Sequence, residues 1–231
     1  MSIHCAPTHQ LQGESVQTTE LTRYYAQRAQ EYDRIYAKPE RQSDLRWLEQ
    51  RSSELCREKR ILEIACGTGY WTQFLCRQAT HITAIDFNQE VLDIARNRDY
   101  GDQSVQFVRD DAYTLEQVEG KFDAAFVGFW WSHVPLCRIH EFLQALHSKL
   151  QPGAKVWLLD NRYVDGSSTP ISRIGTAGNS YQQRPLDDGS EYEVLKNFPT
   201  PEALRQQLAG HTDSVDVLER TYFWLAEYQL A

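Results

Sequence analysis

Short apolar segments alternate with segments of helical periodicity between residues 60 and 159, and this alternation limits the fold more than any other feature. The apolar segments have the length of strands, and the intervening ones place apolar residues on one helical face. We expect strands at Arg60–Ile64, His81–Ile85, Val105–Val108, Phe122–Val127 and Lys155–Leu159, and helices at Tyr70–Arg77, from Asn88 onward and at Arg138–Leu150. Such alternation is typical of a parallel sheet covered on both faces. The sequence therefore predicts a doubly wound α/β fold.

The segment before this core is polar at first and then helical. Residues 1–19 are rich in Gln, Ser, Thr and His without periodicity, so we predict a flexible N-terminal tail. Helical spacing of apolar and aromatic residues follows over Leu21–Tyr36 and again from Arg41 to Cys56. We expect these helices to form a lid.

The C-terminal third contains an insertion and a closing unit. Asp165–Ser180 is rich in Gly, Ser and Thr and is predicted to be a loop. Tyr181–Leu186 and Ser190–Lys196, joined through Asp188-Gly189, predict an inserted β-hairpin. The remaining predicted elements are a helix from Thr200 and strands at Ser214–Glu219 and Tyr222–Gln229. We divide a single domain, residues 20–231, into the helical lid (20–57), a core (58–160), the loop-and-hairpin insertion (161–199) and the closing helix and strand pair (200–231).

Charge and cysteine content narrow the classes of partner. The net charge of −8, with 24 Lys and Arg against 32 Asp and Glu, argues against a nucleic-acid substrate, so we expect a small molecule instead. The five cysteines are widely spaced and form no C-x-x-C pair, which indicates reduced thiols and no metal site. No apolar run has the length of a membrane span, and residues 1–20 lack the apolar segment of a signal peptide. We expect a cytoplasmic protein, either monomer or homodimer.

A glycine turn follows the first predicted strand and carries the main chemical signal. The run reads LEIACGTG, with Glu63 near the strand end and glycines at 67 and 69. A nicotinamide-binding loop has a third glycine where this chain has Thr72, and a carboxylate at 63 would oppose a pyrophosphate. The same carboxylate suits S-adenosylmethionine, which carries a sulfonium and an ammonium and no phosphate. The sequence therefore favours that cofactor.

Two further carboxylates follow the next two predicted strands. Asp86 closes the second strand, where it can accept hydrogen bonds from both ribose hydroxyls. Asp111 follows the third strand and can accept a hydrogen bond from the adenine amino group. Either residue alone fits an ordinary helix cap or turn. Their succession at neighbouring strand ends indicates an adenosyl site.

The ordered runs LEIACGTGYWT, AIDFN, RDDAYTL, FDAAFVGFWWSHVP and LQPGAKVWLLDN resemble the motifs of class I S-adenosylmethionine-dependent methyltransferases. The resemblance implies a seven-stranded sheet whose last strand is antiparallel. It implies that Glu63 helps to hold the methionine ammonium, that Asp86 binds ribose and that Asp111 binds adenine. Further cofactor contacts are implied at Ala65, Gly67, Gly69, Phe87, Ala112, Gly128 and Phe129. Ala65 departs from the glycine usual in this family, and alanine is tolerated there if φ stays negative.

The predicted lid carries a second part of this resemblance. The segment Y-A-Q-R-A-Q-E-Y-D at residues 25–33 resembles a Y-x-x-R-A-x-x-Y-D stretch that covers the methyl donor in many relatives. It implies that Tyr25 and Tyr32 contact the cofactor. A plain amphipathic helix docked on the sheet is the alternative.

The acceptor side is less sharply predicted. Trp130 is expected to flank the substrate, while one of Trp130 and Trp131 packs in the core. His133 is a candidate general base for transfer to oxygen, although a structural or substrate-orienting role is favoured. Residues that follow the fifth strand face the cleft, so Asn161, Arg162 and Tyr163 are further candidates for acceptor contacts. The cations Arg162, Arg173, Arg184 and Lys196 hint at a carboxylate-bearing substrate, but a mixed, solvated surface is the favoured interpretation.

These observations predict an enzyme that transfers a methyl group to a small acceptor, on oxygen or nitrogen, by in-line displacement. Three alternatives stay open at this point: a nicotinamide oxidoreductase, a nucleic-acid methyltransferase and a non-catalytic protein that binds S-adenosylmethionine.

Overall fold

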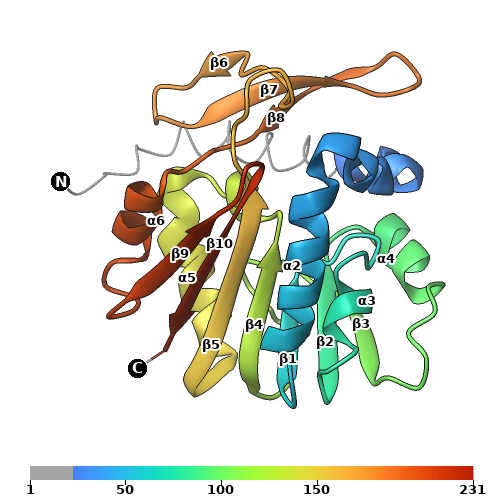
Figure 1. The fold of residues 1–231 in the computed structure, drawn as a ribbon, viewed down its shortest axis with the longest axis vertical. Helices are drawn as coiled ribbons and strands as arrows, with labels where there is room; N and C mark the ends of the chain where they lie inside the picture. The colour runs from blue at the N-terminus through green and yellow to red at the C-terminus, as the bar shows by residue number, and fades with distance from the viewer. Residues whose placement is uncertain (1–22, 231) are drawn as a thin grey trace.

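The chain folds around one seven-stranded sheet of order β3-β2-β1-β4-β5-β10-β9 (Figure 1). The computed structural model describes residues 23–230, with the backbone alone for 29–32, so the predicted tail at 1–19 lies outside the described residues. Strands β1 to β5 are parallel, and β10 is antiparallel to both of its neighbours. The predicted α/β fold is confirmed. The strands are β1 (Arg60–Ile64), β2 (His81–Asp86), β3 (Val105–Arg109), β4 (Phe122–Gly128), β5 (Leu150–Asn161), β9 (Val215–Glu219) and β10 (Phe223–Gln229).

Two hydrophobic cores cover the two faces of this sheet. Side chains alternate along a strand, so Ile61 enters one core with Leu48, whereas Leu62 enters the other with Phe142. Helices on both faces explain why the central parallel strands β1, β2 and β4 are buried along most of their length. The helices are α2 (Gln42–Leu55), α3 (Thr72–Leu75), α4 (Gln89–Arg96), α5 (Ile139–Ser148) and α6 (Pro201–Leu208).

Several predicted boundaries are wrong. The fifth strand begins at Leu150, before Pro152-Gly153. These two residues lie within the strand, at an irregularity in its pairing with β4. The predicted helix Tyr70–Arg77 is reduced to Thr72–Leu75, flanked by turns. In the lid, residues 23–27 are helical and are followed by the 3-10 helices η1 (Ala29–Ala37) and η2 (Pro39–Arg41).

The predicted insertion forms a second, three-stranded sheet. It consists of β6 (Arg173–Ile174), which lies inside the predicted loop, and the hairpin β7 (Ser180–Pro185) and β8 (Glu191–Leu195). Figure 1 shows this sheet lying across the edge at which the parallel strands of the main sheet end. Two short 3-10 helices after β4, η3 (Trp131–His133) and η4 (Leu136–Arg138), lie beneath it. The hairpin therefore covers the carboxyl edge of the main sheet.

Two further observations concern the cysteines and the helices of the described residues. Cys56, Cys66 and Cys76 are free thiols, as expected, and Cys5 lies outside the described residues. Within residues 23–230, no helix has both the length and the apolar character needed to cross a membrane.

A buried ion pair fastens the hairpin to the main sheet. The ammonium of Lys196, just after β8, lies 2.9 Å from a carboxylate oxygen of Asp160 near the end of β5. Both side chains are almost fully buried. Lys196 also donates to the hydroxyl of Ser132 at 2.5 Å, and Asp160 accepts the backbone N–H of Ser132 at 2.9 Å. The hairpin, η3 and β5 therefore meet at one satisfied pair of charges.

Lys196→Met is expected to lower the free energy of unfolding by about 3–5 kcal/mol, because it leaves the Asp160 carboxylate buried without its counter-charge. Urea unfolding measures this loss. Lys155→Met serves as the control, since the pair between Lys155 and Glu227 is half-exposed and its loss is expected to cost less than about 1 kcal/mol. Equal costs for the two variants would show that the buried pair does not anchor the hairpin.

Candidate active site

A cavity of about 140 Å³ lies at the ends of β1, β2 and β3 and is lined by three aspartates, so we call it the acidic cavity. Most of the residues predicted to bind the cofactor line it: Tyr25, Ala65, Gly67, Asp86, Phe87, Asp111, Ala112 and Phe129. Glu63, Gly69 and Gly128 do not line it, and the side chain of Tyr32 lies outside the described residues. Most of the predicted cofactor residues therefore share one cavity, and whether they bind the cofactor stays a prediction.

Asp86 forms the centre of the acidic cavity. One carboxylate oxygen accepts the N–H of Gly67 and the other accepts the N–H of Asn88, both at 2.9 Å. Each oxygen retains a lone pair for a ligand hydroxyl. Burial raises the pKa of Asp86 to about 6, and the backbone hydrogen bonds oppose that shift. The carboxylate is therefore held in place while remaining available to a donor.

Glu63 lies behind the glycine loop and is only 2% exposed. Its carboxylate accepts a hydrogen bond from the Thr72 hydroxyl at 2.7 Å. Burial raises the pKa of Glu63 to about 8. At neutral pH the free carboxyl is therefore largely protonated, and a cation in the acidic cavity would favour its ionised form. The predicted contact with a methionine ammonium stays a prediction.

The third predicted carboxylate, that of Asp111, lies in a turn that follows β3. Asp111 lines the cavity, and one of its oxygens accepts the N–H of Tyr113 at 2.8 Å. Its neighbour Asp110, which the sequence analysis did not select, is buried and accepts the N–H groups of Asp111 and Gln117, both at 2.8 Å. Asp110 therefore fixes the loop that presents Asp111.

The loop between β1 and α3 depends on left-handed backbone. The expectation that φ stays negative at Ala65 is wrong: φ is +53° there, +56° at Gly67 and +76° at Gly69. The N–H of Cys66 donates to the Ile85 carbonyl at 2.8 Å, which ties the loop to β2 in this conformation. Left-handed backbone costs an L-residue about 1–2 kcal/mol, so Ala65 carries strain that glycine would not.

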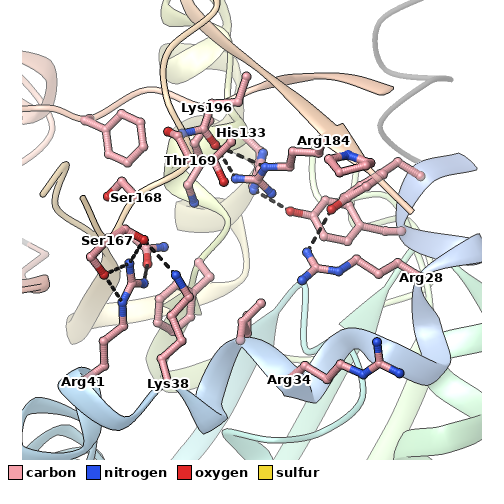
Figure 2. A pocket seen from close by; sticks show the side chains of 18 of the residues that line it. Arg28, Arg34, Lys38, Arg41, His133, Ser167, Ser168, Thr169, Arg184 and Lys196 are labelled. Atoms are coloured by element: carbon pink, nitrogen blue, oxygen red, sulfur yellow. Dashed lines mark hydrogen bonds between the residues drawn. The ribbon is translucent and has the colours of Figure 1, made fainter. Parts of the chain in front are cut away.

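A second cavity, of about 350 Å³, lies beside the first and shares Tyr25, Phe129 and His133 with it. We call it the basic cavity, because Figure 2 shows Lys38 and Arg41 reaching into it from one side and Arg184 from the other. The lid, the end of β5, the loop at 167–169 and the hairpin build its walls. Its basic residues from the lid, Arg28, Arg34, Lys38 and Arg41, were not assigned any role from the sequence.

His133 stands in the wall between the two cavities and is 5% exposed. Its Nδ1 lies 2.7 Å from the Leu195 carbonyl, which can only accept, so Nδ1 carries the proton. Its Nε2 therefore accepts a hydrogen bond from the Tyr25 hydroxyl at 2.8 Å. Burial, and then the charges of Lys196 and Arg184, hold the pKa of His133 well below its usual range. The imidazole is neutral with a defined tautomer.

The residues predicted to contact the acceptor do not all lie in one cavity. Trp130 lines the acidic cavity while Trp131 is 2% exposed, so one tryptophan of the pair packs in the core as expected. Asn161 lines the basic cavity. Arg162 instead pairs with Glu219, and the half-exposed Tyr163 packs against Phe198; neither lines a cavity. Among the other predicted cations, Arg184 and Lys196 line the basic cavity, and Arg173 pairs with Glu193.

No cluster of three or more His, Cys, Asp or Glu side chains suited to a metal ion occurs in the part of the chain that the structure describes.

Gly69→Ala is expected to lower the free energy of unfolding by about 1–2 kcal/mol or more. Its φ is +76°, and an added Cβ would lie 2.2 Å from the Tyr100 hydroxyl and 3.2 Å from the Ala95 Cβ. Ala65→Gly is the matched variant and is expected to leave stability unchanged or raised, since relieved strain outweighs the added freedom of the unfolded chain. Thermal unfolding of both proteins distinguishes them. A destabilised Ala65→Gly variant would contradict the assignment of strain.

Comparison with known proteins agrees with the resemblance that the sequence motifs indicate. The family profile described as "Methyltransferase domain" matches residues 61–153. The demethylmenaquinone methyltransferase of Clavibacter sepedonicus is 34% identical over 100 residues, which are 42% of this chain and 39% of that protein. The demethylmenaquinone methyltransferase of Staphylococcus aureus (strain MRSA252) is 26% identical over 176 residues, 71% of this chain and 70% of that protein. The match therefore spans less than half of the Clavibacter relative.

Solved structures resemble nearly the whole chain. The complex of DhpI with SAH superposes with a TM-score of 0.76 at 28% identity, covering 93% of this chain and 97% of that one. A DhpI–SAM–HEP complex gives a TM-score of 0.75 at 28% identity, covering 91% and 96%. Profile, fold and ordered strand-end motifs agree in their similarity to class I S-adenosylmethionine-dependent methyltransferases.

Proposed function

We propose that this enzyme transfers the methyl group of S-adenosylmethionine to an oxygen or nitrogen of a small-molecule acceptor. The observation that carries the proposal is the shared wall of Tyr25, Phe129 and His133, across which the acidic and basic cavities meet. In-line displacement needs the acceptor atom and the sulfonium methyl to face each other, and two adjoining cavities supply that arrangement. The relatives named above act on, or are bound to, small molecules according to their names.

In this proposal the acidic cavity holds the adenosyl group. Asp86 accepts the ribose hydroxyls through the lone pairs that Gly67 and Asn88 leave unused, and Asp111 accepts from the adenine amino group. The aromatic faces of Phe129 and Trp130 suit the sulfonium, because a cation is attracted to the face of an aromatic ring. The cofactor supplies the methyl group, and the residues of the chain bind it, orient it and exclude water.

His133 acts in this proposal by positioning Tyr25. A base that accepts an acceptor proton needs a pKa near the working pH, and burial keeps that of His133 well below its usual range. Its Nε2 is already occupied by the Tyr25 hydroxyl. Burial also raises the pKa of Tyr25, so the phenol stays protonated and donates. The pair therefore forms a fixed part of the wall against which the acceptor lies.

Asp86→Ala is expected to weaken S-adenosylmethionine binding by about tenfold to a thousandfold, through the loss of charge-assisted hydrogen bonds to ribose. The pKa of about 6 adds a pH dependence. Ribose binding needs the carboxylate of Asp86, so wild-type affinity is expected to fall as the pH drops below about 6, while protonation of Glu63, with its pKa of about 8, affects wild type and variant alike. The variant loses the fall below pH 6. Isothermal titration calorimetry between pH 5 and pH 8 measures both effects.

Asp93→Ala is the matched control, because Asp93 lies on the exposed face of α4. It is expected to leave the affinity unchanged. The same proteins then enter a screen of small acceptors in which released S-adenosylhomocysteine is detected. Unchanged affinity in Asp86→Ala would remove the ribose assignment. A wild-type protein that binds S-adenosylmethionine and releases no S-adenosylhomocysteine with any acceptor would contradict methyl transfer.

Tyr25→Phe and His133→Gln are expected to be coupled in a double-mutant cycle by about 0.5–1.5 kcal/mol, the net worth of one buried hydrogen bond. Urea unfolding of the two single variants and the double variant gives the coupling energy. Tyr25→Phe combined with His147→Gln is the control, since His147 bonds to Tyr228 elsewhere and the two effects should add. A coupling no larger than the control's would show that the pair does not hold the wall.

A further inference from the structure

Four cations face the basic cavity without a carboxylate partner. Arg28 donates to the Tyr24 hydroxyl at 2.9 Å, and Arg184 donates to the Gln182 side-chain oxygen at 2.6 Å. Lys38 donates to the Ser167 carbonyl at 2.7 Å. The fourth is Arg41, whose guanidinium bonds to the carbonyl and hydroxyl of Ser167 and to the amide oxygen of Asn161. All these acceptors are neutral, and among the described side chains, 23–28 and 33–230, none of the four cations forms an ion pair.

The acids near this cavity are already engaged. Asp187 pairs with Arg34 at 2.7 Å, and both of those side chains are largely exposed. Asp160 pairs with Lys196 behind the cavity wall. Glu40 is exposed and accepts a hydrogen bond from the Ser167 hydroxyl at 2.9 Å. The cavity therefore keeps a strong positive charge in a chain whose net charge is −8.

Gathering these cations is unfavourable while the cavity holds only water. Arg41 is 8% exposed, and Arg28, Lys38 and Arg184 are partly buried. Burial and then the charge of Arg41 lower the pKa of Lys38. An anion in the cavity offsets this repulsion. A guanidinium fork also matches the spacing of two oxygens on a phosphate or carboxylate, which makes arginine the common ligand of such groups.

Resting on the proposed function, we infer that the methyl acceptor is a compact molecule with a doubly charged oxyanion, either a phosphate or phosphonate group or two carboxylates. Arg28, Lys38, Arg41 and Arg184 hold that group, and the hydroxyls of the adjacent Ser167–Thr169 loop are available to complete its hydrogen bonds. The 350 Å³ volume limits the acceptor to a small metabolite. The anion fixes the acceptor so that its nucleophilic atom faces the wall shared with the acidic cavity.

The test uses inorganic phosphate and succinate as dianionic probes and acetate as a monoanionic probe. Each probe is titrated calorimetrically into the protein, once with S-adenosylhomocysteine at saturation and once without it. At least one dianion is expected to bind, and to bind at least tenfold more tightly than acetate. Arg184→Gln and Arg28→Gln are each expected to weaken that binding at least tenfold, and Arg184→Lys to restore part of it. Arg57→Gln removes an exposed cation before β1 and is expected to change nothing.

Two results would overturn the inference. One is the failure of both dianions to bind the wild-type protein. The other is wild-type affinity for them in both Arg184→Gln and Arg28→Gln. S-adenosylhomocysteine affinity and the melting temperature, measured on every variant, show whether a loss is confined to the basic cavity. Asp86→Ala separates the two proposals, since it is expected to lose cofactor binding and keep the dianion. A wild-type protein that binds phosphate but no S-adenosylmethionine would refute the proposed function alone.

Discussion

The buried carboxylate of Asp160 joins the segments that separate and enclose the two cavities. It accepts hydrogen bonds from the N–H of Ser132, the N–H of Asn161 and the ammonium of Lys196, at 2.9, 2.7 and 2.9 Å. These groups belong to η3, to the end of β5 and to the chain after the hairpin. A buried charge persists only when its partners stay in place, so these segments cannot separate without a large cost. The position of His133 beside the Leu195 carbonyl follows from this junction.

The two cavities are opposite in charge, and this fits the two ligands we propose. Burial raises the pKa of Asp86 to about 6 and that of Glu63 to about 8, so a cationic donor that favours the ionised forms releases protons on binding near neutral pH. The positive sulfonium and the proposed anionic group of the acceptor attract each other across the shared wall. The charge pattern therefore suits transfer between these two partners.

The lining of the acidic cavity was predictable because its residues follow strands directly in the sequence. Asp86 and Asp111 each end or follow a strand, and parallel strands bring their carboxyl ends to one edge. The basic cavity was not predictable in this way, because Arg41 meets Ser167 across 126 positions of sequence through tertiary packing alone. Asn161 and Arg162 were both expected in the cleft, but side chains alternate at the end of β5, so only Asn161 faces the cavity.

The lid connects the two halves of the proposed mechanism. Its short stretch supplies Tyr25 to the shared wall and Lys38 and Arg41 to the basic cavity. Between them, Asp33 accepts a hydrogen bond from Thr68 in the glycine loop at 2.6 Å. A sheet common to the whole family cannot select an acceptor, because its edge serves the cofactor that all members share. Selection must then come from side chains outside the sheet, and here the lid ties those side chains to the glycine loop, which in our proposal borders the methyl donor.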